Sequence, residues 1–175
     1  MFTEHNDYDN PQDKLEKMPL YQKGKEILDV VRMLADLIDD DDKKLGWIKQ
    51  FMLEDAYMLT AKIANAEGGD LYSIRMENAA LMRKAGNSLN LHIHSLRQFG
   101  FEHADYYEMV RDKVEEYRLL FIDWVAGFDQ THYITDNWGL FNPPGVSPFD
   151  EPDHSGGDDF NPDWLDDFFG DEDDE

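Results

Sequence analysis

Apolar residues recur at intervals of three and four positions through most of the chain, which is the spacing of one face of an α-helix. Four such stretches follow one another between residues 18 and 126, and short polar or glycine-containing turns separate them. The pattern predicts four amphipathic helices, at residues 19–38, 43–66, 71–99 and 104–126. No stretch competes by showing the strict alternation of a half-buried strand.

Turn residues mark the ends of these helices. Pro19 fits a first helical turn, where a missing N–H is not needed. Asp42 and Asp70 are placed to cap the N-termini of the second and third helices. Glycines follow the second, third and fourth helices, and glycine tolerates the backbone conformations that end helices. The predicted helices are therefore bounded at both ends by residues that suit those positions.

Amphipathic helices joined by short turns bury their apolar faces best by packing against one another. We therefore predict an all-α fold, in which residues 18–127 form an up-down-up-down antiparallel four-helix bundle. Residues 1–17 are polar and acidic, with few apolar positions, and we expect them to be a flexible acidic lead.

The chain after Gly127 divides into two segments. Residues 128–146 are too aromatic to be left in water, and we expect an irregular aromatic strap that folds back onto the bundle or docks on a partner. Trp138 and Phe141 are its candidate partner-binding residues. Residues 147–175 are rich in Pro, Gly and Asp, a composition that predicts a disordered acidic tail.

The formal net charge of −23 is concentrated in this C-terminal part. Residues 1–17 hold 5 acids and 2 bases, residues 18–126 hold 19 acids and 14 bases, and residues 127–175 hold 15 acids and no base. A segment of that charge repels nucleic acid and anionic membranes and attracts basic surfaces. We therefore predict a protein partner with a basic surface, and no direct binding to nucleic acid or to a membrane.

The absence of cysteine excludes disulfides, thiol nucleophiles and thiolate metal sites. Nowhere do about 18 apolar residues follow one another, as a membrane-spanning helix requires. Residues 1–11 also lack the basic and apolar regions of a secretory signal peptide. Together these features predict a cytoplasmic protein.

Several polar side chains fall near the middle of otherwise apolar helix faces. Three of them, Asp55, Asn78 and His92, form a predicted interior polar cluster. Buried polar groups must be paired, so the preferred interpretation is a structural network in which Asp55 meets a facing Lys, Arg or His. The alternative is a small ligand-binding or catalytic site, because a carboxylate and an imidazole in apolar surroundings can have shifted pKa values.

Known catalytic and metal-binding motifs are missing from the predicted helices. A bundle that holds two metal ions between carboxylates needs Glu-x-x-His pairs on its helices. The one such pair, Glu151 and His154, lies in the proline-containing tail. His92 and His94 are two positions apart and point to nearly opposite sides of a helix. We predict no metal, no cofactor and no enzymatic activity.

The C-terminal tail carries a more specific pattern. Aspartates alternate there with four large apolar side chains, Trp164, Leu165, Phe168 and Phe169. Aromatic side chains supply buried area and carboxylates steer the encounter, so such a segment can dock on a basic groove lined by apolar residues. The groove could belong to another protein or to the protein's own bundle, and either mode would be salt-sensitive.

Three stretches resemble a family of small four-helix-bundle proteins. They are Pro19–Lys23, Met52–Ala66 and Met76–Ala85. The family includes proteins encoded by intervening sequences in bacterial 23S ribosomal RNA genes and accessory proteins of diversity-generating retroelements. Over residues 18–126 the resemblance implies a non-enzymatic bundle that can assemble into a homo-oligomeric ring, with nucleic acid or a nucleic-acid enzyme as partner. The retroelement accessory proteins are basic and this chain is acidic, which favours a protein partner.

Three functions follow as hypotheses. The first is a non-enzymatic adaptor or scaffold that binds a basic protein, such as one that processes nucleic acid, through its acidic and aromatic C-terminal segment. The second is a small ligand-binding or catalytic bundle that uses the interior polar cluster. The third is a nucleic-acid mimic that inhibits a protein which binds DNA or RNA.

Overall fold

The computed structural model describes residues 10–150, and within that range the regular secondary structure is all helical, with no strand. The helices are α1 (Pro11–Glu16), α2 (Pro19–Ala35), α3 (Lys43–Glu67), α4 (Tyr72–Gln98), the 3₁₀-helix η1 (Ala104–Tyr107) and α5 (Glu108–Ala126). The predicted all-α class is confirmed.

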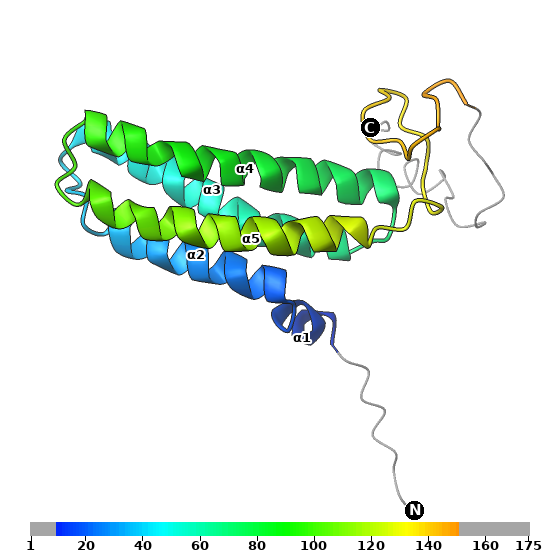
Figure 1. The fold of residues 1–175 in the computed structure, drawn as a ribbon, viewed down its shortest axis with the longest axis horizontal. Coiled ribbons are helices and arrows are strands. Elements are labelled where there is room, and N and C mark those ends of the chain that lie inside the picture. Colours follow the sequence, from blue (N-terminus) through cyan, green and yellow to red (C-terminus); the bar gives the residue numbers. More distant parts are fainter. Residues whose placement is uncertain (1–9, 151–175) are drawn as a thin grey trace, which may run out of the picture.

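The four long helices, α2 to α5, lie side by side (Figure 1). Helix α2 packs against α3 and α5, and α4 packs against the same two helices, so each long helix has two neighbours. The apolar stripes of all four meet between them and form the core. Its fully buried side chains include Ile27, Met52, Leu59, Ile63, Met82, Leu89, Ile93, Leu96, Tyr107 and Val110.

The predicted helix boundaries hold to within a few residues, with differences at two ends. Helix α2 ends at Ala35 rather than at residue 38, and the next residues form a turn in which the Ile38 N–H donates to the Ala35 carbonyl. Asp42 caps α3 as predicted, because its carboxylate accepts hydrogen bonds from the backbone N–H groups of Lys44 and Leu45. The fourth predicted helix, residues 104–126, is divided into η1 and α5.

The prediction that Asp70 caps α4 is wrong. Leu71 is the residue that precedes the helix, and no side chain caps it. The Tyr72 N–H instead donates to the carbonyl of His132, 2.8 Å away, while Asp70 Oδ2 lies 3.0 Å from His132 Nδ1. A chain segment that follows α5 therefore supplies the hydrogen-bond acceptor for a backbone N–H at the start of α4.

The predicted flexible lead, residues 1–17, is wrong for residues 11–16, which form α1. Asn10 accepts a hydrogen bond from the Gln12 N–H, and Pro11 occupies the first turn, so the helix has a capped start. Leu15 is buried and joins the core. A single buried apolar residue is too few to produce a recognisable period, which is why the pattern did not predict this helix.

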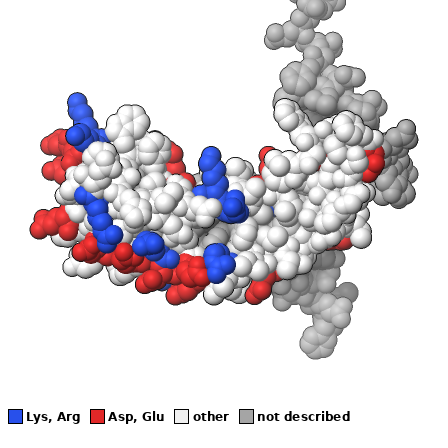
Figure 2. Space-filling model, turned by 45° about the horizontal axis from the view of Figure 1, so that its top comes forward, with Lys and Arg blue, Asp and Glu red and all other residues white. Residues whose placement is uncertain are grey.

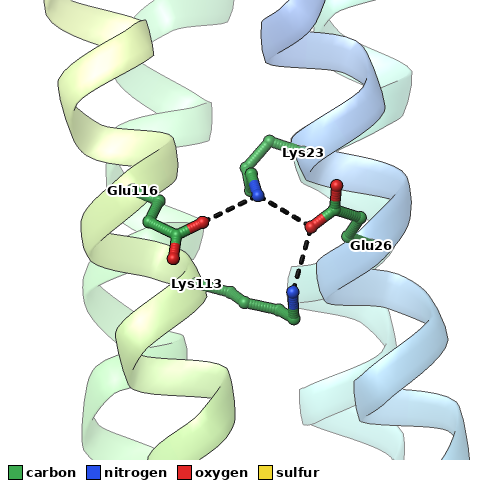
Figure 3. Close-up of polar contacts among 4 residues, drawn as sticks. All are labelled: Lys23, Glu26, Lys113 and Glu116. Atoms are coloured by element: carbon green, nitrogen blue, oxygen red, sulfur yellow. Dashed lines mark hydrogen bonds and ion pairs between the residues drawn. The ribbon is translucent and has the colours of Figure 1, made fainter.

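Four charged side chains, Lys23, Glu26, Lys113 and Glu116, join α2 to α5, and we call them the α2–α5 ion-pair chain (Figure 3). Lys23 Nζ lies 2.7 Å from carboxylate oxygens of both Glu116 and Glu26, and Lys113 Nζ lies 3.0 Å from Glu26. Hydrogen bonds to Glu116 and then to Glu26 raise the pKa of Lys23. Both carboxylates are solvent-exposed, so each pair contributes little stability alone.

Candidate functional site

Residues 127–150 follow α5 as an irregular segment at the end of the molecule where α5 stops and α4 begins (Figure 1). Its first part is anchored to the helices. Phe128 is buried and meets the edge of the Trp124 ring, with 4.6 Å between the ring centroids. The guanidinium of Arg75 lies 4.6 Å from the centroid of the Phe128 ring, a cation–π contact.

Glu67, at the end of α3, completes this anchor. Its Oε1 atom accepts a hydrogen bond from Trp124 Nε1 at 2.9 Å and forms an ion pair with Arg75. The side chains of Glu67 and Arg75 are largely shielded from solvent. We call these four residues, Glu67, Arg75, Trp124 and Phe128, the anchor cluster. It ties the ends of α3, α4 and α5 to the segment that follows them.

Beyond the anchor cluster, the chain folds into a loop around one carboxylate. Asp136 accepts hydrogen bonds from the backbone N–H groups of Trp138, Leu140 and Phe141, each at 2.9 Å. The Asn142 side chain accepts from the Asp136 N–H and donates to the Asp136 carbonyl. We call residues 134–150 the Asp136 loop. Five hydrogen bonds centred on one residue fix its backbone.

The N–H groups of Phe141 and Trp138, followed by that of Leu140, hold the pKa of Asp136 below its ordinary value. A lowered pKa means that the charged carboxylate, and the stability it gives the loop, persist at neutral pH. They are lost only as the pH falls through the lowered pKa. Gly139 helps to close the loop, because its φ of 70° favours glycine and an added Cβ would lie 3.1 Å from Pro148.

The Asp136 loop holds four large apolar side chains in solvent, of which Ile134, at 55%, is the least exposed. Trp138 is 94% exposed, Leu140 is 73% exposed and Phe149 is 92% exposed. Figure 2 shows one face of the molecule, on which charged side chains gather toward one half and the half nearer residues 127–150 carries few. Apolar side chains displayed in solvent from a fixed backbone form a candidate docking surface.

The predicted strap residues differ from one another in how far they are buried. Phe128 and Tyr133 pack on the helices, as a strap would. Trp138 projects into solvent, as a docking residue would, whereas Phe141 is half-buried within the loop. Ile134, Leu140 and Phe149 are exposed as well, and sequence reasoning did not select them as docking residues. Composition shows that the segment is aromatic, but it does not show which side chains the loop turns outward.

Part of the predicted disordered tail, residues 147–150, forms a turn in which the Ser147 N–H donates to the Asp150 carboxylate at 2.7 Å. The remaining tail residues lie outside the described range. They include the predicted partner-binding residues Trp164, Leu165, Phe168 and Phe169.

The interior polar cluster is divided by the structure. Asp55 Oδ2 on α3 lies 2.7 Å from His92 Nε2 on α4, which is the kind of facing pair that was predicted. Asn78 does not join them, because it precedes His92 by fourteen residues on the same helix, or about 21 Å of helix length. Its side chain donates to the Ile74 carbonyl at 2.8 Å instead.

The geometry of the Asp55–His92 pair limits the chemistry that it can perform. Ser88 Oγ lies 3.4 Å from His92 Nε2, the same ring nitrogen that meets Asp55. A nucleophilic triad needs the serine on one imidazole nitrogen and the carboxylate on the other. These three side chains therefore do not form a proton relay from serine to carboxylate.

Tyr107 is a feature of the interior that the sequence did not single out. Its side chain is fully buried, and its hydroxyl has no hydrogen-bond partner among residues 10–150. Burial raises the pKa of Tyr107, and the negative charge of Asp55 raises it further. The hydroxyl therefore stays protonated, and it is a buried donor without an acceptor.

Replacing Tyr107 with phenylalanine should increase the free energy of unfolding by about 1 kcal/mol, because an unsatisfied buried polar group costs roughly that much or more. Tyr117 provides the matched control, since its hydroxyl donates to the Leu59 carbonyl at 2.9 Å. Tyr117→Phe should lower the same free energy by about 1 kcal/mol. Urea unfolding followed by circular dichroism measures both, and equal losses in the two variants would contradict the assignment.

The described residues contain no group of three or more His, Asp or Glu side chains arranged to hold a metal ion. None of the helices in residues 10–150 combines the length and apolar character needed to cross a membrane.

No protein-family model matches this chain, and no curated protein or solved structure matches it. The resemblance of residues 18–126 to the intervening-sequence and retroelement accessory proteins therefore stays a prediction. The observations that bear on function are those of the site itself, namely a helical support, an anchored segment and a rigid loop that displays apolar side chains.

Proposed function

We propose that this protein is a non-enzymatic cytoplasmic adaptor that binds a protein partner with a basic surface through its C-terminal segment. In this proposal α2 to α5 form an up-down-up-down antiparallel four-helix bundle, which serves as a rigid support. The Asp136 loop supplies the docking side chains that belong to the described residues. Trp164, Leu165, Phe168 and Phe169 extend the docking segment beyond them.

The observation that carries the proposal is the exposure of Trp138, Leu140 and Phe149 on a fixed loop. Large apolar side chains held in water are unfavourable unless a partner covers them. A preorganised loop also loses little conformational entropy on binding. The hydrogen bonds to Asp136 fix the loop, and this preorganisation favours the interpretation that its exposed apolar residues bind a partner.

Charge supports a basic partner. Residues 127–150 contain Asp129, Asp136 and Asp150 and no Lys or Arg, and the 12 acids of residues 151–175 follow them. Carboxylates around an apolar centre accelerate encounter with a positively charged surface and disfavour acidic competitors. The partner's surface should therefore combine an apolar pocket with Lys and Arg at its rim.

Replacing Trp138, Leu140 and Phe149 together with alanine should reduce partner capture at least about tenfold, because central apolar anchors dominate interface energies. The measurement is a quantitative pull-down from source-cell lysate with immobilised full-length protein. The matched control replaces Trp47, Phe51 and Leu91, which are exposed apolar residues on the helices. Both triple variants should keep the helical circular dichroism of the unsubstituted protein.

Asp136→Ala provides a second variant that removes no apolar side chain. It deletes the acceptor of three backbone N–H groups, so the loop loses its fixed form and capture should fall as well. A protein that is captured equally by all four baits would contradict docking through the loop. Release of the captured protein by an oligonucleotide would instead support the nucleic-acid-mimic hypothesis.

A further inference from the structure

A groove of about 270 Å³ runs between α4 and α5. Its apolar lining comes from Met82 on α4 and from Val114, Phe121 and Ile122 on α5. Gly86 helps to open it, because an added Cβ at this residue would only come within 3.9 Å of Val114. We call this feature the α4–α5 groove, and neither Asp55 nor His92 lines it.

The charge of the α4–α5 groove differs from that of the chain as a whole. Arg83 and Arg118 line it and no Asp or Glu does, although the protein has 39 acids against 16 Lys and Arg. Arg83 is exposed and forms no ion pair with any residue in the described range 10–150. Arg118 pairs with Glu115 of its own helix in solvent, an interaction that another carboxylate can replace or share.

We propose that the α4–α5 groove binds the acidic and aromatic segment 160–169 of the same chain. The segment carries Trp164, Leu165, Phe168 and Phe169, which suit an apolar floor, and it also contains three aspartates. Residues 151–175 contain 12 acids and no Lys or Arg, so the segment is complementary in charge to the two arginines.

The length of the chain permits this contact. The groove begins at Ile122, four residues or about 6 Å of helix before the end of α5 at Ala126. The Asp136 loop lies at that same end of the molecule (Figure 1). From Asp150 to Trp164 the chain can span up to roughly 46 Å when extended, so the segment reaches the full length of the groove.

This contact goes beyond the adaptor function, because it needs no partner and describes the free protein. It gives the tail two competing sites, its own groove and the basic surface of a partner. A partner must then displace the segment from the groove, so its apparent affinity is its intrinsic affinity multiplied by the fraction of molecules in which the groove is empty.

Site-specific disulfide formation in the full-length protein tests the proposal, and the absence of native cysteine makes every cross-link unambiguous. Gly170→Cys places a thiol directly after the proposed segment, and Asn87→Cys places one in the groove. The matched control pairs Gly170→Cys with Tyr57→Cys. Tyr57 is exposed on α3 and stands nearly level with the groove, because Asp55 on α3 faces His92 on α4.

Under mild oxidation of dilute protein, the groove pair should form an intramolecular disulfide at least about tenfold faster than the control pair, because docking raises the local thiol concentration. Added Arg83→Glu and Arg118→Glu substitutions should remove that advantage. The control substitutions Lys25→Glu and Arg32→Glu should leave that advantage unchanged, because they lie on α2. Arg32 pairs with Asp29 at the same spacing as Arg118 with Glu115, so the two arginines are comparable. Increasing salt should slow the groove pair alone.

Equal rates for the two cysteine pairs would overturn the proposal. Disulfide-linked dimers whose yield rises with protein concentration would also overturn it, because they would show that the tail of a second copy occupies the groove. Neither result bears on the adaptor function, because no partner is present in the assay.

Discussion

Replacing Glu67 with alanine should lower the free energy of unfolding by about 2 kcal/mol, through the loss of two partners at once. The substitution leaves the shielded guanidinium of Arg75 without its carboxylate and Trp124 Nε1 without its acceptor. The effect is smaller than for a fully buried pair, because both charged side chains retain some contact with solvent. Urea unfolding monitored by circular dichroism measures it.

Glu54→Ala is the control for Glu67→Ala. Glu54 lies on α3 as well, but it accepts a hydrogen bond only from Gln50 on an exposed face. Its removal should change the free energy of unfolding by less than about 0.5 kcal/mol, as most surface substitutions do. Equal unfolding midpoints for the two variants would show that the anchor cluster contributes no net stability.

Replacing Leu59 with alanine should have the largest effect on stability, a loss of about 2–5 kcal/mol. Leu59 is completely buried on α3, and α2 and α4 pack on either side of that helix. The backbone of the same residue accepts the Tyr117 hydroxyl, so the surroundings are tied together and cannot collapse into the cavity. For a chain of this length, the midpoint of thermal unfolding should fall by roughly 10 °C.

Leu91→Ala is the matched control for Leu59→Ala, because Leu91 is 63% exposed on α4. It removes the same atoms from a position where they contact water, and the midpoint should hardly move. A loss at Leu59 no greater than that at Leu91 would contradict the core as described.

The helices could be predicted from the sequence because their stripes are long and periodic. Leu59, Met82 and Leu89 all follow from spacing alone, and all are completely buried. Spacing also placed Asp55 and His92 on apolar faces. Because buried polar groups need partners, this placement predicted that Asp55 pairs with a facing side chain, and it contacts His92. The same reasoning wrongly grouped Asn78 with them, because a position on a helix face does not specify the height along the helix axis.

The candidate site was less predictable, because contacts between distant residues build it. The Tyr72 N–H is satisfied by His132, sixty residues later, so a cap expected from Asp70 was not needed. Local sequence contains no information about such a partner. The loop depends in the same way on one carboxylate, Asp136. In the sequence this residue cannot be distinguished from a solvated aspartate, and only the structure shows its three N–H donors.

The α2–α5 ion-pair chain has a consequence for the order in which the protein folds and opens. Lys23 and Glu116 are 93 residues apart in sequence, whereas α3 and α4 are joined by a short turn and pack most extensively. Chain entropy delays contacts between distant residues, so we expect α3 and α4 to associate early and the seam between α2 and α5 to close last. By the same reasoning, this seam is where the native protein first opens, and screening of its charges by salt acts on the rate of unfolding rather than on the rate of folding.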